Sequence, residues 1–128
     1  MTEYGQLVRI TFILHVIVGI IFGIGFLLVP DLLYPIFGMT FEDPNARTFG
    51  AMIIGLSMGS ILALMTKEWE QVKILVEIEL IWTLLGPIVM IYHMFTPPLY
   101  GVMMWGPILI LLVLWVLFLI GYLQEKKK

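Results

Sequence analysis

The chain has 128 residues, of which 61% are hydrophobic and 12% are charged, and its mean hydropathy is +1.05. A soluble domain carries about 25% charged residues, and one of this length has too little interior to bury so much apolar surface. The composition therefore indicates an integral membrane protein. A net charge of −2 without a basic arm argues against a nucleic-acid partner. The absence of cysteine excludes disulfides, thiolate metal sites and cysteine catalysis.

Four apolar segments follow one another along the chain, each about 20 residues or longer, the length that a helix needs to cross a bilayer. We expect helices near residues 7–29, 46–66, 71–95 and 102–123. The first segment is too long for a cleavable signal peptide, and no small-residue cleavage site follows it. The sequence predicts an all-α fold, an integral membrane four-helix bundle, with residues 1–128 forming a single transmembrane domain.

Residues 30–45, PDLLYPIFGMTFEDPN, separate the first two helices. This loop is amphipathic and contains three prolines. We expect it to form a short helix and a turn in the membrane interface, on the outer side.

Basic residues predict the orientation of the bundle. Four crossings place both termini and the turn between the second and third helices on the same side. That side carries most of the basic residues, namely Arg9, Lys67, Lys73, Lys126, Lys127 and Lys128. The other side carries Arg47 together with Asp31, Glu42 and Asp43. Because Lys and Arg are retained in the cytoplasm, we expect both termini on the cytoplasmic side of the cell membrane.

Small residues recur at helical spacing in the first two helices. In the first helix, Gly19 and Gly23 continue a line that begins at Thr11 and His15. The second helix has a stripe with a step of four residues, which contains Ala51, Gly55, Gly59 and Ala63. Such stripes let helix backbones approach closely. We expect these two helices to pack against each other, with a dimer interface as the alternative.

The third helix carries two glutamates in the stretch ILVEIELIW. Glu77 and Glu79 lie about 200° apart around a helix, so they cannot act together as an acid–base pair. Glu77 follows Lys73 by four residues, a spacing that favours an ion pair. We expect Glu77 to join Lys73 and Arg9 in a charge layer at the cytoplasmic edge.

Glu79 lies deeper, on the same face as Thr83. His15 of the first helix lies at a similar depth, so we expect Glu79 and His15 to meet inside the bundle. An intramembrane ionisable pair indicates one of two roles: a polar clamp that fixes helix register, or a proton-linked or ligand-binding site. One histidine and one glutamate are too few ligands for a metal, so we expect no metal and no cofactor.

Residues 29–65 contain the segments VPDLLYPIFG, N-A-R-x-F-G-A and GLSMG. This half of the chain resembles the small four-helix membrane proteins of the DoxX-like and related uncharacterised families. The resemblance implies a four-helix membrane fold and brings no settled activity. Small multidrug transporters have a similar length, but their essential glutamate lies in the first helix, where this chain has His15. Their function is therefore not transferred.

The expected function is that of a small multi-pass membrane protein, non-enzymatic, acting as an accessory or structural subunit of a membrane complex. The last helix motivates this expectation, because it is apolar all round and is expected to face lipid or another subunit. The alternative is a small oligomeric proton-linked transporter or channel that uses Glu79 and His15. A membrane enzyme acting on a lipid or quinone ranks last. The expected partners are the lipid bilayer and either other membrane subunits or further copies of the chain.

Overall fold

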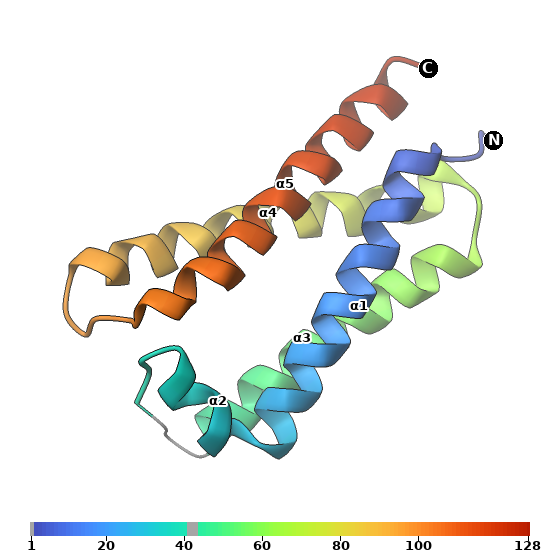
Figure 1. Cartoon of the computed structure of the whole chain (residues 1–128). Coiled ribbons are helices and arrows are strands. Elements are labelled where there is room, and N and C mark those ends of the chain that lie inside the picture. Colours follow the sequence, from blue (N-terminus) through green and yellow to red (C-terminus); the bar gives the residue numbers. More distant parts are fainter. Residues whose placement is uncertain (1, 41–43) are drawn as a thin grey trace.

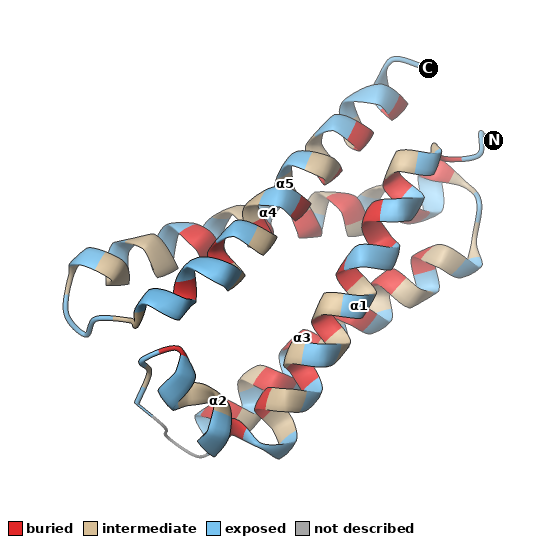
Figure 2. Cartoon of the chain, viewed as in Figure 1, coloured by how far each residue is buried: buried red, intermediate tan, exposed pale blue. Residues whose placement is uncertain are grey.

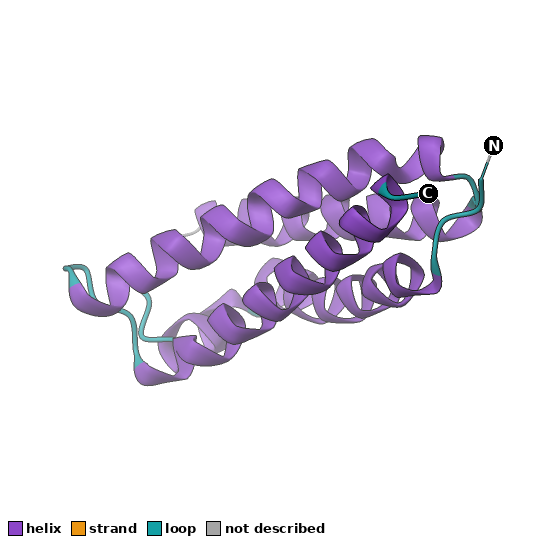
Figure 3. Cartoon of the chain, turned by 90° about the horizontal axis from the view of Figure 1, so that it is seen from above, coloured by secondary structure: helices purple, strands orange, loops and turns teal. Residues whose placement is uncertain are grey.

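The computed structural model describes residues 2–40 and 44–128. Its helices are α1 (Gln6–Leu28), α2 (Pro30–Ile36), α3 (Asn45–Met65), α4 (Trp69–Phe95), the 3-10 helix η1 (Val102–Met104) and α5 (Trp105–Lys126). Short loops join them (Figure 3). The α1, α3, α4 and η1–α5 segments are each long and apolar enough to cross a membrane. The predicted all-helical fold is confirmed, and the predicted helix boundaries agree with the structure to within a few residues.

Prolines set the first boundary. Pro30 lies at the first position of α2, where its missing N–H leaves no helical hydrogen bond unmade. Proline also disfavours the helical conformation in the residue before it, and Val29 has a non-helical φ of −133° and ψ of 48°. The short helix expected in the outer loop is therefore present as α2. Residues 41–43, which include the acidic Glu42 and Asp43 of the orientation argument, lie outside the described residues.

The long helices form two hairpins. α1 packs along α3, with α2 in their connection, and α4 packs along α5. Both termini lie with the α3–α4 turn at one end of the molecule, which we call the terminal end, whereas α2 lies at the opposite end, the α2 end (Figure 1). The hairpins come together towards the terminal end and diverge towards the α2 end (Figure 1). Buried residues line the facing sides of the helices, and the outward sides are exposed (Figure 2).

Two apolar clusters fill the bundle. The cluster of the terminal half is built around Val8, Phe12 and Phe118 and joins α1 to α4 and α5. The cluster of the α2 half includes Phe26 and Phe37 and extends to Met104 and Ile108. α1 and α5 also approach each other closely in the terminal half, where a Cβ atom on Gly121 would lie 2.7 Å from the Val8 side chain.

Hydrogen bonds tie the chain ends to the terminal end of the bundle. The Tyr4 hydroxyl donates to the Ala63 carbonyl over 2.8 Å. Burial raises the pKa of Tyr4 above its usual value, with the neighbouring Arg9 opposing the shift. Glu125 is 6% exposed and accepts the backbone N–H of Gly5 and the ammonium of Lys128. The carboxylate thus ties the C-terminal end of α5 to the residue that precedes α1.

The α1–α3 contact depends on glycine and serine. A Cβ atom on Gly50 would lie 2.5 Å from the backbone nitrogen of Leu27 and 2.7 Å from the carbonyl oxygen of Gly23. One on Gly19 would overlap the Ser57 hydroxyl at 2.0 Å. The expected contact between these two helices is therefore present, and Gly19 and Gly23 take part in it.

The small-residue stripe expected on α3 is wrong in its first half. Ala51 is exposed, and nothing lies within 4 Å of a Cβ on Gly55. Gly59 faces Leu75 of α4, and Ala63 is buried. A step of four residues turns about 40° beyond a full circle at each step, and on α3 this stripe begins on the exposed side and reaches the buried side only at Ala63. The residues of α3 that are buried are Ala46, Gly50, Ile53, Ser57, Ser60 and Ala63.

The last helix is less exposed than its composition suggested. In the most apolar stretch of the η1–α5 segment, 28% of the residues are buried, against 22% in that of α4. α5 packs on α1 and α4, and α4 packs on α5 and α3.

The α1–α3 contact generates a test with a matched control. Gly50→Ala should lower the free energy of unfolding by about 1–3 kcal/mol, because the added methyl group meets backbone atoms that cannot move independently. Gly55→Ala on the same helix adds the same methyl group in open space and should not destabilise the protein. Thermal or denaturant unfolding in detergent measures both changes. Equal stability of the two variants would contradict the contact.

Candidate functional site: a buried histidine beside an aromatic cavity

His15 of α1 and Glu79 of α4 meet inside the bundle, as the sequence predicted. His15 Nε2 lies 3.4 Å from Glu79 Oε2. The two residues are 2% and 3% exposed. Trp82 and Phe118 place their rings against the imidazole, with centroid distances of 6.1 and 6.3 Å. The contact joins the two hairpins close to where they begin to diverge.

Ser60 of α3 fixes the other side of the imidazole. Its hydroxyl oxygen lies 2.6 Å from His15 Nδ1. The hydroxyl has no other acceptor in residues 2–40 and 44–128, whereas Ser57 on the same helix donates to the Ile53 carbonyl. We therefore assign Ser60 as the donor and Nδ1 as the acceptor. A neutral ring then carries its proton on Nε2.

Nε2 is left without a hydrogen bond. It is the one buried side-chain nitrogen or oxygen atom without a hydrogen-bond partner in the described part of the chain. The Glu79 oxygen is 3.4 Å away, farther than the roughly 2.7–3.2 Å of an N–H···O hydrogen bond. An unmade hydrogen bond at a buried donor costs about 1–3 kcal/mol, so this atom calls for an explanation.

Glu79 obtains its hydrogen bonds from its own helix. The indole Nε1 of Trp82 donates to Glu79 Oε2 over 2.6 Å. Thr83, predicted to share the site, is fully buried, but its hydroxyl donates to the backbone carbonyl of Glu79. Thr83 therefore lies on the expected face without contributing a free polar group.

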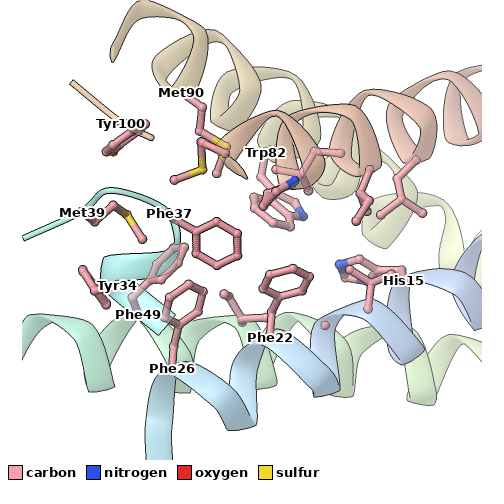
Figure 4. A pocket seen from close by; sticks show the side chains of 18 residues that line it. His15, Phe22, Phe26, Tyr34, Phe37, Met39, Phe49, Trp82, Met90 and Tyr100 are labelled. Carbon is pink, nitrogen blue, oxygen red and sulfur yellow. The ribbon is translucent and has the colours of Figure 1, made fainter. Parts of the chain in front are cut away.

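A cavity of about 350 Å³ extends from His15 towards the α2 end. His15 lies at one end of it, and Tyr34, Met39 and Tyr100 lie at the other (Figure 4). Both hairpins contribute to its wall, which is mostly aromatic and also contains methionine. The aromatic residues are Phe22, Phe26, Tyr34, Phe37, Phe49, Trp82 and Tyr100.

Two loops contact each other at the α2 end of the cavity. The N–H of Gly101 donates to the Phe37 carbonyl over 2.8 Å. Gly38 has a φ of +68°, and a Cβ on it would lie 2.2 Å from the Gly101 nitrogen. Only glycine combines this left-handed conformation with so close an approach. The loop after α2 is thereby fixed to the loop before η1.

Glu77 has a different partner from the one predicted. The Tyr122 hydroxyl of α5 donates to Glu77 Oε1 over 3.1 Å. Within the described residues, no ion pair within 4.0 Å joins Glu77 to Lys73 or Arg9. Glu77 is nevertheless near the terminal end and away from the cavity. Helix geometry separated the two glutamates correctly, although it did not find Tyr122.

Three participants were not assigned to the site or the fold from the sequence. Trp82 follows Glu79 by three residues, a spacing at which helical side chains are neighbours. The sequence therefore contained a signal for the contact between these two residues. Ser60 was not assigned to the site, because its partner depends on the rotation of α3. Glu125 was not assigned a role from the sequence. Among the described residues, no group of three His, Cys, Asp or Glu side chains could hold a metal ion.

Comparisons of the chain with protein-family models, with curated proteins and with solved structures find no match. The resemblance of residues 29–65 to the DoxX-like proteins stays a prediction.

Proposed function

We propose that this chain is a multi-pass integral membrane protein with both termini in the cytoplasm. Four long apolar helices support the proposal. In each of them, the rest of the chain leaves most residues of the most apolar stretch unburied. Such surface is stable in a bilayer and unfavourable in water. The terminal end collects six of the seven basic residues, which supports the orientation through the retention of Lys and Arg in the cytoplasm.

Within the membrane we assign the chain an accessory or structural role. The observation that carries this role is the way in which buried polar side chains link helices. Ser60 joins α3 to α1 through His15, Tyr4 joins the N-terminus to α3, and Glu125 joins α5 to the start of α1. Bonds of this kind fix helix register in a bilayer. The exposed apolar faces of α4 and α5 are available to lipid or to a partner subunit.

One observation favours the second candidate, a small proton-linked transporter or channel. Glu79 and His15 are ionisable, buried and in contact, and His15 borders a cavity. Ionisable residues within membrane spans mark proton and ion pathways in pumps and transporters. Transport through this chain would have to pass through this pair.

The orientation generates a labelling prediction. The chain has no cysteine, so single cysteines report on one site each. Thr2→Cys and Lys127→Cys should react with a membrane-impermeant maleimide only after the cells are permeabilised. Thr40→Cys, in the exposed loop after α2, should react in intact cells. The reverse pattern would contradict the orientation, and reaction of all three positions in intact cells would contradict membrane insertion.

Two measurements separate the accessory role from transport. Purification in a mild detergent followed by mass spectrometry should recover a membrane protein partner in a fixed ratio. Recovery of this chain alone would contradict the accessory role. In liposomes containing the purified protein, Glu79→Gln and His15→Ala should leave proton flux at the wild-type level. Loss of a flux that the wild-type protein shows would instead establish transport through the pair.

A further inference from the structure

We propose that the cavity binds the flat, uncharged ring system of a lipid-soluble molecule, held by contacts with aromatic rings and methionines and by no hydrogen bond. The proposal concerns a ligand and does not depend on the accessory role. It rests on the chemistry of the cavity wall, on the different side chains that the two hairpins contribute to it, and on the contacts that a lipid tail cannot make with such a wall.

The wall offers neither a charge nor a free polar atom at its His15 end. None of the 18 described residues that line the space is a Lys, Arg, Asp or Glu. His15 Nδ1 accepts the Ser60 hydroxyl, and Nε2 is buried beside Glu79 Oε2. The Trp82 N–H donates to the same carboxylate. A charged ligand would therefore lose its hydration without gaining a partner. Apolar cavities stay dry, so an apolar ligand would displace no bound water.

The first hairpin supplies a surface of packed rings. Phe22 and Phe26 of α1 stack, with ring centroids 6.2 Å apart and planes 29° apart. Phe37 lies 6.1 Å from Phe22, and Phe49 of α3 lies 5.3 Å from Phe26. Because these rings hold one another, the surface is formed before a ligand binds, and its ordering costs little on binding. Such rings favour stacked or edge-on contacts with another flat ring.

The second hairpin faces these rings with more adaptable side chains. Met90 and Trp82 of α4 lie across the space from Phe22 (Figure 4). Met104 of η1 also lines the cavity. Methionine sulfur contacts aromatic rings favourably, and the flexible side chain adapts to irregular shapes. The volume of about 350 Å³ is within the range of small-molecule sites. The space therefore suits a flat molecule with rings on one side of it and methionines on the other.

Ring contacts, rather than burial of apolar surface, provide the selectivity. Lipid tails are as apolar as the wall, so a molecule that leaves the bilayer for the cavity gains little hydrophobic free energy. It gains dispersion contacts that an unfilled space lacks, and ring–ring contacts that an acyl chain cannot make. We therefore expect the cavity to prefer a flat ring system to a chain of similar size.

Three probes test this selectivity. Fluorene and n-tridecane have the same number of carbon atoms and no polar atom, but only fluorene consists of flat rings. Fluorene-2-carboxylate keeps the rings and adds a negative charge. We would measure fluorene and the carboxylate by equilibrium dialysis against the whole protein in lipid nanodiscs, and tridecane by its displacement of fluorene. Empty nanodiscs of the same lipid correct for partitioning, and affinities are expressed relative to the probe concentration in the bilayer.

Fluorene should bind saturably, with one site per chain. Tridecane should bind about two- to tenfold more weakly, the difference that ring contacts contribute. The carboxylate should show no saturable binding, because the wall offers its charge no partner.

Variants of the wall locate the site. Met90→Trp overfills the space and should weaken fluorene binding about tenfold or more. Val89→Trp, its neighbour on α4, adds the same ring at a position that is 54% exposed and outside the wall, and should bind fluorene like the wild type. Phe22→Leu removes one ring but keeps an apolar side chain, and should reduce the preference for fluorene over tridecane. Unfolding temperatures that match the wild type would establish that the variants are folded.

Each contrary result overturns a defined part of the proposal. Absence of saturable fluorene binding would exclude the ligand site. Equal affinities for fluorene and tridecane would exclude selection by rings and favour a lipid chain as the occupant. Saturable binding of the carboxylate would exclude the requirement for an uncharged ligand. Unchanged fluorene binding in a folded Met90→Trp or Phe22→Leu variant would exclude this cavity as the place of binding. None of these outcomes bears on whether a partner subunit co-purifies, so the proposal and the accessory role fail independently.

Discussion

Helices in a bilayer gain little hydrophobic energy from touching one another, because lipid tails are as apolar as their side chains. In a bilayer, where we propose this chain to lie, the fold depends on a close backbone contact between helices, and that contact is the seam between α1 and α3. Gly19, Gly23 and Gly50 bring the two helices so near that an added methyl group would overlap atoms of the opposite helix. This seam also decides the rotation of α3, and so presents the Ser60 hydroxyl to His15. The position of the imidazole follows from the packing of the backbones.

The same packing leaves room in one half of the molecule. Near the terminal end, Gly121 lets α5 approach Val8, and Phe12 packs against Phe118 with a ring-centroid distance of 5.3 Å. Beyond His15 the hairpins diverge (Figure 1), and large aromatic side chains line the gap instead of closing it. His15 stands at the boundary between these halves. It belongs to the polar contacts of the packed half and lines the open half.

The sequence was sufficient for features that depend on one helix or on depth in the membrane. Hydropathy located the four helices that are long and apolar enough to cross a membrane, and counting residues from the helix ends brought His15 and Glu79 together. Prediction from the sequence failed for contacts that depend on how a helix is rotated about its axis. The stripe through Ala51 and Gly55 turned away from α1, while Gly50 and Ser57 formed the contact. It could not indicate the cavity, because that space depends on the angle between the hairpins. The Glu77–Tyr122 and Glu125–Gly5 bonds join residues 45 and 120 positions apart, for which no local pattern exists.

The central claim is that Ser60 holds a neutral His15 with its proton on Nε2, the ring nitrogen that lies beside Glu79 Oε2. Nitrogen NMR of isotope-labelled histidine, with the protein in lipid nanodiscs, measures the protonation of each ring nitrogen directly. The chain has two histidines, so a His93→Gln variant assigns the signals. We predict one protonated nitrogen, Nε2, and an unprotonated Nδ1 that changes its shift in Ser60→Ala. A ring protonated on both nitrogens, or on Nδ1 alone, would contradict the account.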